Sequence, residues 1–249
     1  MEKYFFDERL EEAILYAKSR ILTAVVSGTE YNAVFPPGRT PKNVQRNKTP
    51  CLVRKCSSAE GSCMVEAVSA DSMETEKKEW ICMDPLLFKN ATGFFLENHS
   101  MAEMAGHYTN FRKDQAIASI HIDFTASDGT MIDAKVSMAG IETALGKKQD
   151  KSCPILTPGL IMGYMNILNI PKYAENRMIL LLIQQHGPGY PVSVMDGKTY
   201  ESVKTGCAYG LELWNAVMQM NPESISLVSC RCVTDDILSD AGLFYILKK

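Results

Sequence analysis

The chain has 249 residues, a length that suits one large domain or two smaller ones. Hydrophobic residues make up 46% and charged residues 22%, a balance that permits a packed core and excludes wholesale disorder. The formal net charge of -3 excludes a histone-like polycation, so an anionic partner would have to meet a local basic surface. The longest aliphatic run, Met178–Ile183, is far shorter than the roughly 20 residues of a membrane helix, and the acidic first residues lack the pattern of a signal peptide. We therefore expect a soluble, cytoplasmic protein with no membrane partner.

The first predicted element is a helix that begins near Asp7. Leu10, Ala13, Ile14 and Ala17 recur at the spacing i, i+3, i+4 and i+7, which would form one apolar stripe. Short β-like segments separated by turn residues follow at 21–26, 30–35, 51–56, 62–68 and 79–83. Short strands without helices between them predict a small barrel or sandwich over about residues 20–83.

The pattern changes at Asp84 and Pro85, where a capping carboxylate before a proline is typical of a helix start. Beyond this point, strands are expected at 111–117, 119–126, 130–137, 177–184 and 224–233, and helices from Thr157 and over about 200–220. Strands that alternate with helices predict right-handed crossovers and a partly parallel sheet. The chain therefore divides into residues 1–83, a β-barrel with an N-terminal helix, and residues 84–249, a mixed α/β unit.

The cysteines of the first third favour thiols over a metal site. Cys51, Cys56, Cys63 and Cys82 form no C-x-x-C pair, and no histidine lies among them. We expect them to be buried or free.

The segment 119–137 reads as two half-buried strands joined at Asp128-Gly129. A two-residue turn would place Asp123 opposite Ala134 and split the apolar residues between the two faces. A three-residue loop, with glycine in the left-handed conformation, instead places Asp123 opposite Asp133. The second register is favoured because it aligns one apolar set on a single face: Ile122, Phe124, Ile132, Ala134 and Val136. Asp123, Asp133 and Lys135 then gather on the other face.

Two carboxylates at close range repel each other unless a cation or a proton lies between them. A hard divalent ion such as Mg²⁺ suits oxygen ligands, and Lys135 could then stabilise a phosphate oxygen or orient an attacking water. The alternative is a surface ion pair between Lys135 and the two aspartates, which would stabilise the fold by about 0–1 kcal/mol.

Asp123 followed across a hairpin by Asp133-Ala134-Lys135 resembles the PD-(D/E)xK nuclease signature. More widely, the chain is similar to the sugar fermentation stimulation protein family through motifs that occur in the same order. These are SRILTAVV, FPPGRT, WICMDPLLFKNAT, AEMAGHY, HIDF, DAKVS, LLLIQQ, the expected helix around 211–216, and SISLVSCRC. The resemblance implies an OB-like N-terminal barrel followed by a restriction-endonuclease-like mixed α/β sheet.

The resemblance also implies roles for individual residues. The site residues would be Asp123, Asp133, Lys135, Glu103 from the preceding helix, and Gln184 at a strand end. The metal ligands would be Asp123, Asp133 and Glu103, and the ion Mg²⁺ or Mn²⁺.

Two departures stand out. His121 replaces an arginine that the family usually has, and LTPGLIMGYM lacks the charges of the corresponding family segment. The implied function is DNA binding, either with weak metal-dependent phosphodiesterase activity or without cleavage, and a regulatory or scaffold protein of the same fold is the alternative.

A basic stretch lies between Glu30 and Glu60, where the sequence has no acidic residue. Its cations are predicted to contact nucleic-acid phosphates without sequence preference: Arg39, Lys42, Arg46, Lys48, Arg54 and Lys55. Tyr31 and Phe35 are close enough in sequence to offer stacking. A solvated loop is the alternative.

Overall fold

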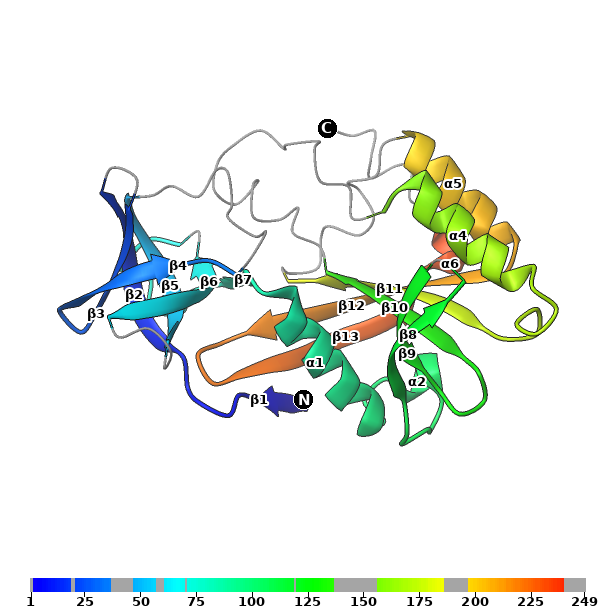
Figure 1. The fold of residues 1–249 in the computed structure, drawn as a ribbon, viewed down its shortest axis with the longest axis horizontal. Coiled ribbons are helices and arrows are strands. Elements are labelled where there is room, and N and C mark those ends of the chain that lie inside the picture. The colour runs from blue at the N-terminus through cyan, green and yellow to red at the C-terminus, as the bar shows by residue number, and fades with distance from the viewer. Residues whose placement is uncertain are drawn as a thin grey trace.

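The computed structural model describes residues 2–18, 21–36, 47–56, 61–69, 71–118, 120–136, 156–185 and 197–239. Five strands near the N-terminus close into a barrel (Figure 1, blue to cyan): β2 (Glu11–Lys18), β3 (Ile21–Val26), β4 (Thr29–Val34), β5 (Asn47–Lys55) and β6 (Ser62–Ser69). β2 pairs with β3 and β5, β5 pairs with β6, and β4 joins β3 to β6 through one antiparallel and one parallel ladder. This closed order is the topology of an OB-like barrel.

The barrel corrects the prediction of an N-terminal helix, because residues 11–18 form β2. Ala13 and Leu15 are buried on alternate positions, while Ile14 between them is half-buried. The apolar residues at the start of the chain therefore fit a period of two as well as a period of 3.6. Pairing with β3 on one side and β5 on the other decides in favour of the strand.

A mixed sheet forms the rest of the described chain. Its order is β7 (Trp80–Cys82), β12 (Leu211–Met220), β11 (Met178–Gln184), β10 (Met131–Val136), β9 (Ile120–Thr125) and β8 (Arg112–Ile117). β11 runs parallel to both β10 and β12, whereas β8 and β9 are antiparallel. β13 (Ser224–Cys232) pairs with β12 and with the short β1 (Lys3–Phe5). The predicted mixed α/β architecture is thus confirmed.

Hydrogen bonds run from the barrel into this sheet through β7. That strand pairs with β6 of the barrel and reaches β12 through the pair Met220–Trp80. The division of the chain at residues 83 and 84 stays a prediction.

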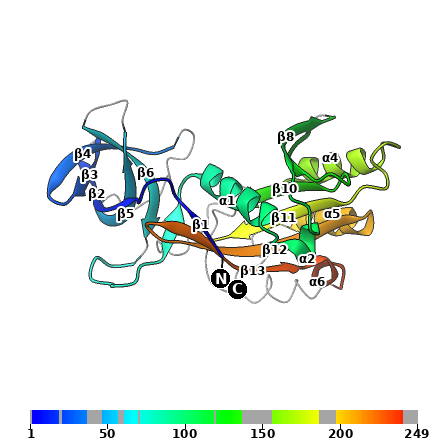
Figure 2. The same cartoon turned by 90° about the horizontal axis from the view of Figure 1, so that it is seen from below.

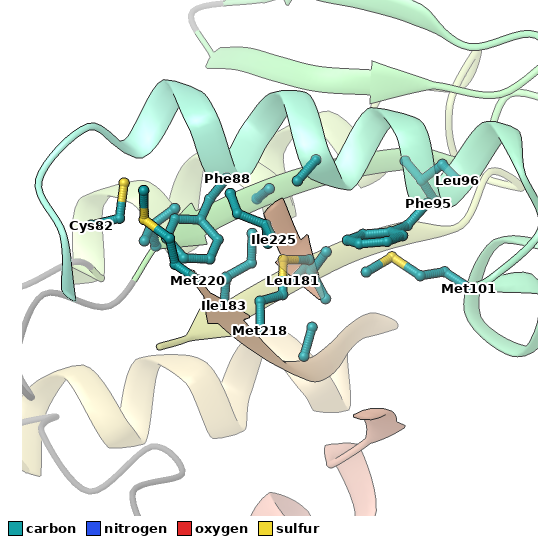
Figure 3. Packing of buried hydrophobic residues seen from close by; sticks show 14 of the residues in the cluster. Cys82, Phe88, Phe95, Leu96, Met101, Leu181, Ile183, Met218, Met220 and Ile225 are labelled. Atoms are coloured by element: carbon teal, nitrogen blue, oxygen red, sulfur yellow. The ribbon is translucent and has the colours of Figure 1, made fainter. Parts of the chain in front are cut away.

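Helices cover both faces of the mixed sheet (Figure 2). α1 (Pro85–Glu97) and α2 (Ala102–Ala105) pack on one face, where Phe88 and Phe95 meet Leu181 and Ile183 (Figure 3). On the other face lie α4 (Pro158–Leu168), α5 (Gly197–Ala208) and α6 (Thr234–Leu238). Burial on both faces explains why β11 is a continuous apolar run. None of the described helices is long and apolar enough to span a membrane.

Two helix starts follow the sequence signals closely. The Asp84 carboxylate accepts a hydrogen bond from the Leu86 backbone N–H, and the Thr157 hydroxyl accepts one from the Leu160 N–H. A proline follows each cap, as expected for a first helical turn. These caps fix where α1 and α4 begin and therefore which of their side chains face the sheet.

The helix predicted over about 200–220 ends early. α5 stops at Ala208, and Gly210 adopts a φ of +97°, after which residues 211–220, including the 211–216 piece, form β12. β12 is buried on both faces between β11 and β13, so its apolar residues carry no simple period. This ambiguity between a buried strand and a helix accounts for the error.

Three of the cysteines from the first third are core residues, namely Cys51, Cys63 and Cys82. Burial raises the pKa of the Cys51 thiol to about 12, and the neighbouring Cys63 adds to the shift. These thiols act as small apolar side chains.

Candidate functional site

The hairpin between β9 and β10 has the predicted register. Met131 pairs with Thr125 and Ile132 with Phe124, and the Ala126 N–H donates to the Thr130 carbonyl at 2.8 Å. The loop therefore has three residues, 127–129, and Gly129 adopts the expected positive φ of +89°. Continuing this register places Asp123 opposite Asp133.

The prediction that Ile122 and Ala134 share one face is wrong. Ala134 packs beneath α1, whereas Ile122 packs in the cluster beneath α4, so the two do not share a face. The ladder between the strands ends at Phe124, and the Ala134 N–H donates instead to Asp123 Oδ2 at 2.8 Å. The two strands separate at this point, and β9 carries Ile122 across to α4.

Asp123 is 3% exposed, and each of its oxygens has a hydrogen-bond donor. Besides Ala134, Lys89 of α1 places its Nζ 2.5 Å from Oδ1. Burial alone would raise the pKa of this carboxyl. Hydrogen bonds from Asp133 and Lys89, together with the positive charge of Lys89, outweigh burial and hold the pKa below its usual value.

Asp133 is fully buried and equally enclosed. Lys135 Nζ lies 2.6 Å from Oδ1, and the Tyr164 hydroxyl of α4 donates to Oδ2. Burial raises the pKa of Asp133 to about 6, against the lowering effect of Lys135, and the adjacent Asp123 pushes it in the same upward direction. Of the two carboxyls, Asp133 is thus the one that takes up a proton first.

A third carboxylate extends the row on the other side of Asp123. Lys113 pairs with Phe124 and Gln115 with Ile122, so Asp114 of β8 lies opposite Asp123. Asp114 Oδ1 is 3.2 Å from His121 Nε2. One ligand atom each from Asp114, His121 and Asp123 lie within 4.8 Å of one another.

Sequence reasoning missed Asp114, Lys89 and Tyr164. Asp114 stands in a segment whose pattern predicts a strand, and pairing that strand with β9 would have revealed it. Lys89 and Tyr164 come from helices on opposite faces of the sheet, and no local pattern marks either of them.

Two predicted site residues lie away from this row. Glu103 lies in the first turn of α2 and lines a cavity with Cys230 of β13, a strand separated from β10 by β12 and β11. At about 4.8 Å per strand, this separation is roughly 14 Å. Gln184 is buried at the end of β11, four positions beyond Leu180, the partner of Asp133. The roles of Glu103 and Gln184 stay predictions.

The structure describes only part of the basic stretch. Arg39, Lys42 and Arg46 lie outside the described residues, and Lys48 is exposed at the start of β5. Arg54 Nε is 3.0 Å from Glu66 Oε1, and Glu66 is only 5% exposed. Lys55 pairs with Glu11 at 2.7 Å and lies over the ring of Tyr31, and Tyr31 and Phe35 both pack against the barrel core. Arg54 and Lys55 thus have partners within the barrel.

The fold is that of an OB-like barrel followed by a mixed α/β sheet. A similar solved structure is that of SfsA, the sugar fermentation stimulation protein A, from Pyrococcus furiosus in complex with Ca²⁺. The match has a TM-score of 0.65, covers 92% of this chain and 97% of that chain, and has 12% sequence identity. No family model matches the chain, and no curated protein is significantly similar to it in sequence. The resemblance noted in the sequence is confirmed at the level of the fold.

The predicted metal ligands fit a divalent ion only in part. The carboxyls of Asp123 and Asp133 are within hydrogen-bonding reach of each other, as ligands of one ion would be, but Glu103 lines a separate cavity. Both oxygens of each aspartate already accept hydrogen bonds, those of Asp133 from Lys135 and Tyr164 and those of Asp123 from Lys89 and the Ala134 N–H. Asp123 is the predicted ligand that borders further metal-binding groups, namely Asp114 and His121.

The enclosure of Asp133 gives a testable consequence for stability. Replacing Tyr164 by Phe removes a hydrogen bond to a buried carboxylate, so the free energy of unfolding at pH 7 should fall by about 1.5–3 kcal/mol. The Tyr164 bond favours the ionised form of Asp133, so its loss raises the folded-state pKa further. Because the pKa of Asp133 is higher in the folded protein than in the unfolded chain, Asp133 stabilises the fold when it is protonated, and this contribution is lost as pH rises. The loss of unfolding free energy caused by Tyr164→Phe should therefore be smaller at pH 4 than at pH 7.

Tyr200→Phe is the matched control, because the Tyr200 hydroxyl donates to the uncharged Ile237 carbonyl. Urea denaturation of the parent and both variants at pH 7 and pH 4 measures the effect. A Tyr164→Phe deficit that is as independent of pH as that of Tyr200→Phe would contradict the assigned role of Tyr164.

Proposed function

We propose that this protein is a distant member of the sugar fermentation stimulation protein family that binds DNA without sequence preference and cuts it slowly or not at all. The observation that carries the proposal is the placement of Asp123, Asp133 and Lys135 around one three-residue hairpin, in a fold shared with SfsA. Two carboxylates and a lysine are the groups that a metal-dependent phosphodiesterase needs to hold an ion and to stabilise a phosphate oxygen. Mg²⁺ or Mn²⁺ would supply the positive charge at the attacked phosphate.

Slow cleavage follows from how closely Asp133 is enclosed. Its two oxygens accept from Lys135 and Tyr164, so the lysine ammonium is committed to a carboxylate and the second oxygen faces a core hydroxyl. Tyr164 belongs to the helix whose sequence lacks the charges of the related family. A phosphate that approached from α4 would meet apolar side chains, and a desolvated anion without partners is costly to bind.

The proposed DNA surface is the basic stretch of the barrel. Arg39, Lys42, Arg46 and Lys48 are the cations assigned to phosphate contacts, whereas Arg54 and Lys55 are occupied by Glu66 and Glu11. Contacts to phosphates position a protein on DNA but read no bases, so the binding would be non-specific.

Binding is tested by replacing Arg39, Lys42 and Arg46 together with alanine. The DNA affinity should fall, and the slope of log K against log salt should flatten by about one unit for each phosphate that is no longer neutralised. Fluorescence anisotropy of a labelled duplex over a salt series measures both quantities. The control replaces the exposed Lys3, Lys77 and Lys198, which changes the net charge equally. Equal effects of the two triple variants would show that the basic stretch is an ordinary solvated loop.

Cleavage is tested separately by titrating Mg²⁺ and Mn²⁺ with plasmid and oligonucleotide substrates. We expect nicking that is slow or absent, and any true activity should disappear in Asp133→Asn and Lys135→Ala. Residual cutting that survives both substitutions would indicate a contaminant. Rapid cutting that depends on Lys135 would refute the view that the enclosed site is nearly inactive.

A further inference from the structure

We infer that Asp114, His121 and Asp123 form a divalent-metal site on the β8–β9 hairpin that binds Mn²⁺ in preference to Mg²⁺. This site differs from the ligand set implied by the family resemblance, because it takes two residues that the resemblance does not use. It goes beyond the proposed function and does not require that the protein bind or cut DNA.

The geometry of the hairpin brings the three ligands together. Asp114 and Asp123 are opposite each other on antiparallel strands, and His121 is two residues from Asp123 on the same strand. His121 and Asp123, two residues apart on β9, project from the same face of the sheet, and Asp114, whose φ is +55°, is placed beside them by its contact with His121. Asp114 Oδ1 and His121 Nε2 are 3.2 Å apart, and all three ligand atoms lie within 4.8 Å of one another. Adjacent ligands of an octahedral ion with bonds of about 2.1 Å lie about 3 Å apart, so little movement is needed.

The exposure of the ligands leaves room for an ion. The side chains of Asp114 and His121 are 75% and 56% exposed, whereas Asp123 is anchored in the core. An ion bound there would have three protein ligands on its inner side and water on its outer side. A coordination shell made partly of protein ligands and partly of water suits an ion that exchanges readily and can accept a further oxygen ligand.

The donor set determines which ion is preferred. Imidazole nitrogen suits first-row transition ions, of which Mn²⁺ binds most weakly, whereas Mg²⁺ and Ca²⁺ prefer shells made of oxygen. A neutral His121 offers one ring nitrogen as a ligand, and Asp114 and Asp123 supply carboxylate oxygens. This mixture of one nitrogen and two oxygens therefore favours Mn²⁺ over Mg²⁺.

The electrostatic setting also favours a cation. Asp114, Asp123 and Asp133 form a row across β8, β9 and β10, and like charges on neighbouring strands repel. Lys135 forms an ion pair with Asp133, and Lys89 of α1 forms an ion pair with Asp123. Asp114 is paired with His121, whose charge depends on protonation. A divalent ion at the Asp114 end would complete the neutralisation, although it must tolerate the ammonium of Lys89.

The test uses Mn²⁺ as the probe, with isothermal titration calorimetry and electron paramagnetic resonance of the full chain without DNA. Asp114→Asn and His121→Ala alter exposed side chains and should leave the fold intact, which circular dichroism checks. Each should weaken Mn²⁺ binding by about tenfold or more. Lys89→Met should tighten it, because that change removes the cation that competes at Asp123. Mg²⁺ should displace Mn²⁺ only in large excess.

Two control variants sharpen the test. Glu103→Gln removes the carboxylate that the family resemblance assigns as a ligand, and His107→Ala removes a histidine whose ring lies 5.4 Å from that of His99. Both should bind Mn²⁺ like the parent. Loss of binding in either control, Mn²⁺ binding by His121→Ala that is as tight as that of the parent, or no Mn²⁺ binding by the parent would overturn the inference. Failure of DNA binding alone would refute the proposed function and leave this site standing.

Discussion

The structure of the site depends on one electrostatic constraint, which is that three aspartates lie side by side on adjacent strands and two of them are buried. A buried carboxylate without a partner is strongly destabilising, and a neighbouring carboxylate makes it worse. The protein meets this constraint with groups from different elements. Lys89 comes from α1, Lys135 from β10 itself, and Tyr164 from α4. The helices on the two faces of the sheet are therefore held to it by polar contacts as well as by apolar packing.

This arrangement links the helix caps to the chemistry of the site. Asp84 caps α1 and thereby sets the position of Lys89, while Thr157 caps α4 and sets that of Tyr164. Both helices also bury large side chains against the sheet, such as Phe88 on one face and Tyr164 itself on the other. A shift of either helix by one residue would remove a partner from a buried carboxylate. The same contacts that stabilise Asp133 also enclose it, which is why we expect phosphodiesterase chemistry at this site to be weak.

Much of this architecture could be predicted from local patterns. The hairpin register followed from the two-residue period of its strands and from the glycine of the turn, because only one register brings Ile132 and Phe124 together. The starts of α1 and α4 followed from capping residues before proline. The errors have a different origin. Residues 11–18 and 211–220 contain apolar side chains that fit either a helix or a strand, and pairing with distant strands decides between them.

The site was predictable only where its residues lie on one hairpin. Asp123, Asp133 and Lys135 are neighbours in sequence across one turn, and the register alone brings them together. Lys89 and Tyr164 are supplied by helices 34 and 31 positions away from their partners. Asp114 required knowledge that β8 pairs with β9 and not with another strand. Ile122 illustrates the same limit, because the separation of two strands beyond Phe124 is a tertiary effect that no sequence period encodes.

The central claim is that charge compensation between elements holds the carboxylate row in place, and a double-mutant cycle on Lys89 and Asp123 tests it most directly. The free energy of unfolding is measured for the parent, Lys89→Met, Asp123→Asn and the double variant by urea denaturation at pH 7. Charge compensation predicts that the double variant is destabilised by less than the sum of the two single effects, with a coupling energy of about 1–3 kcal/mol. Single effects that simply add would show that the two residues lie close together without depending on each other, and would contradict the central claim.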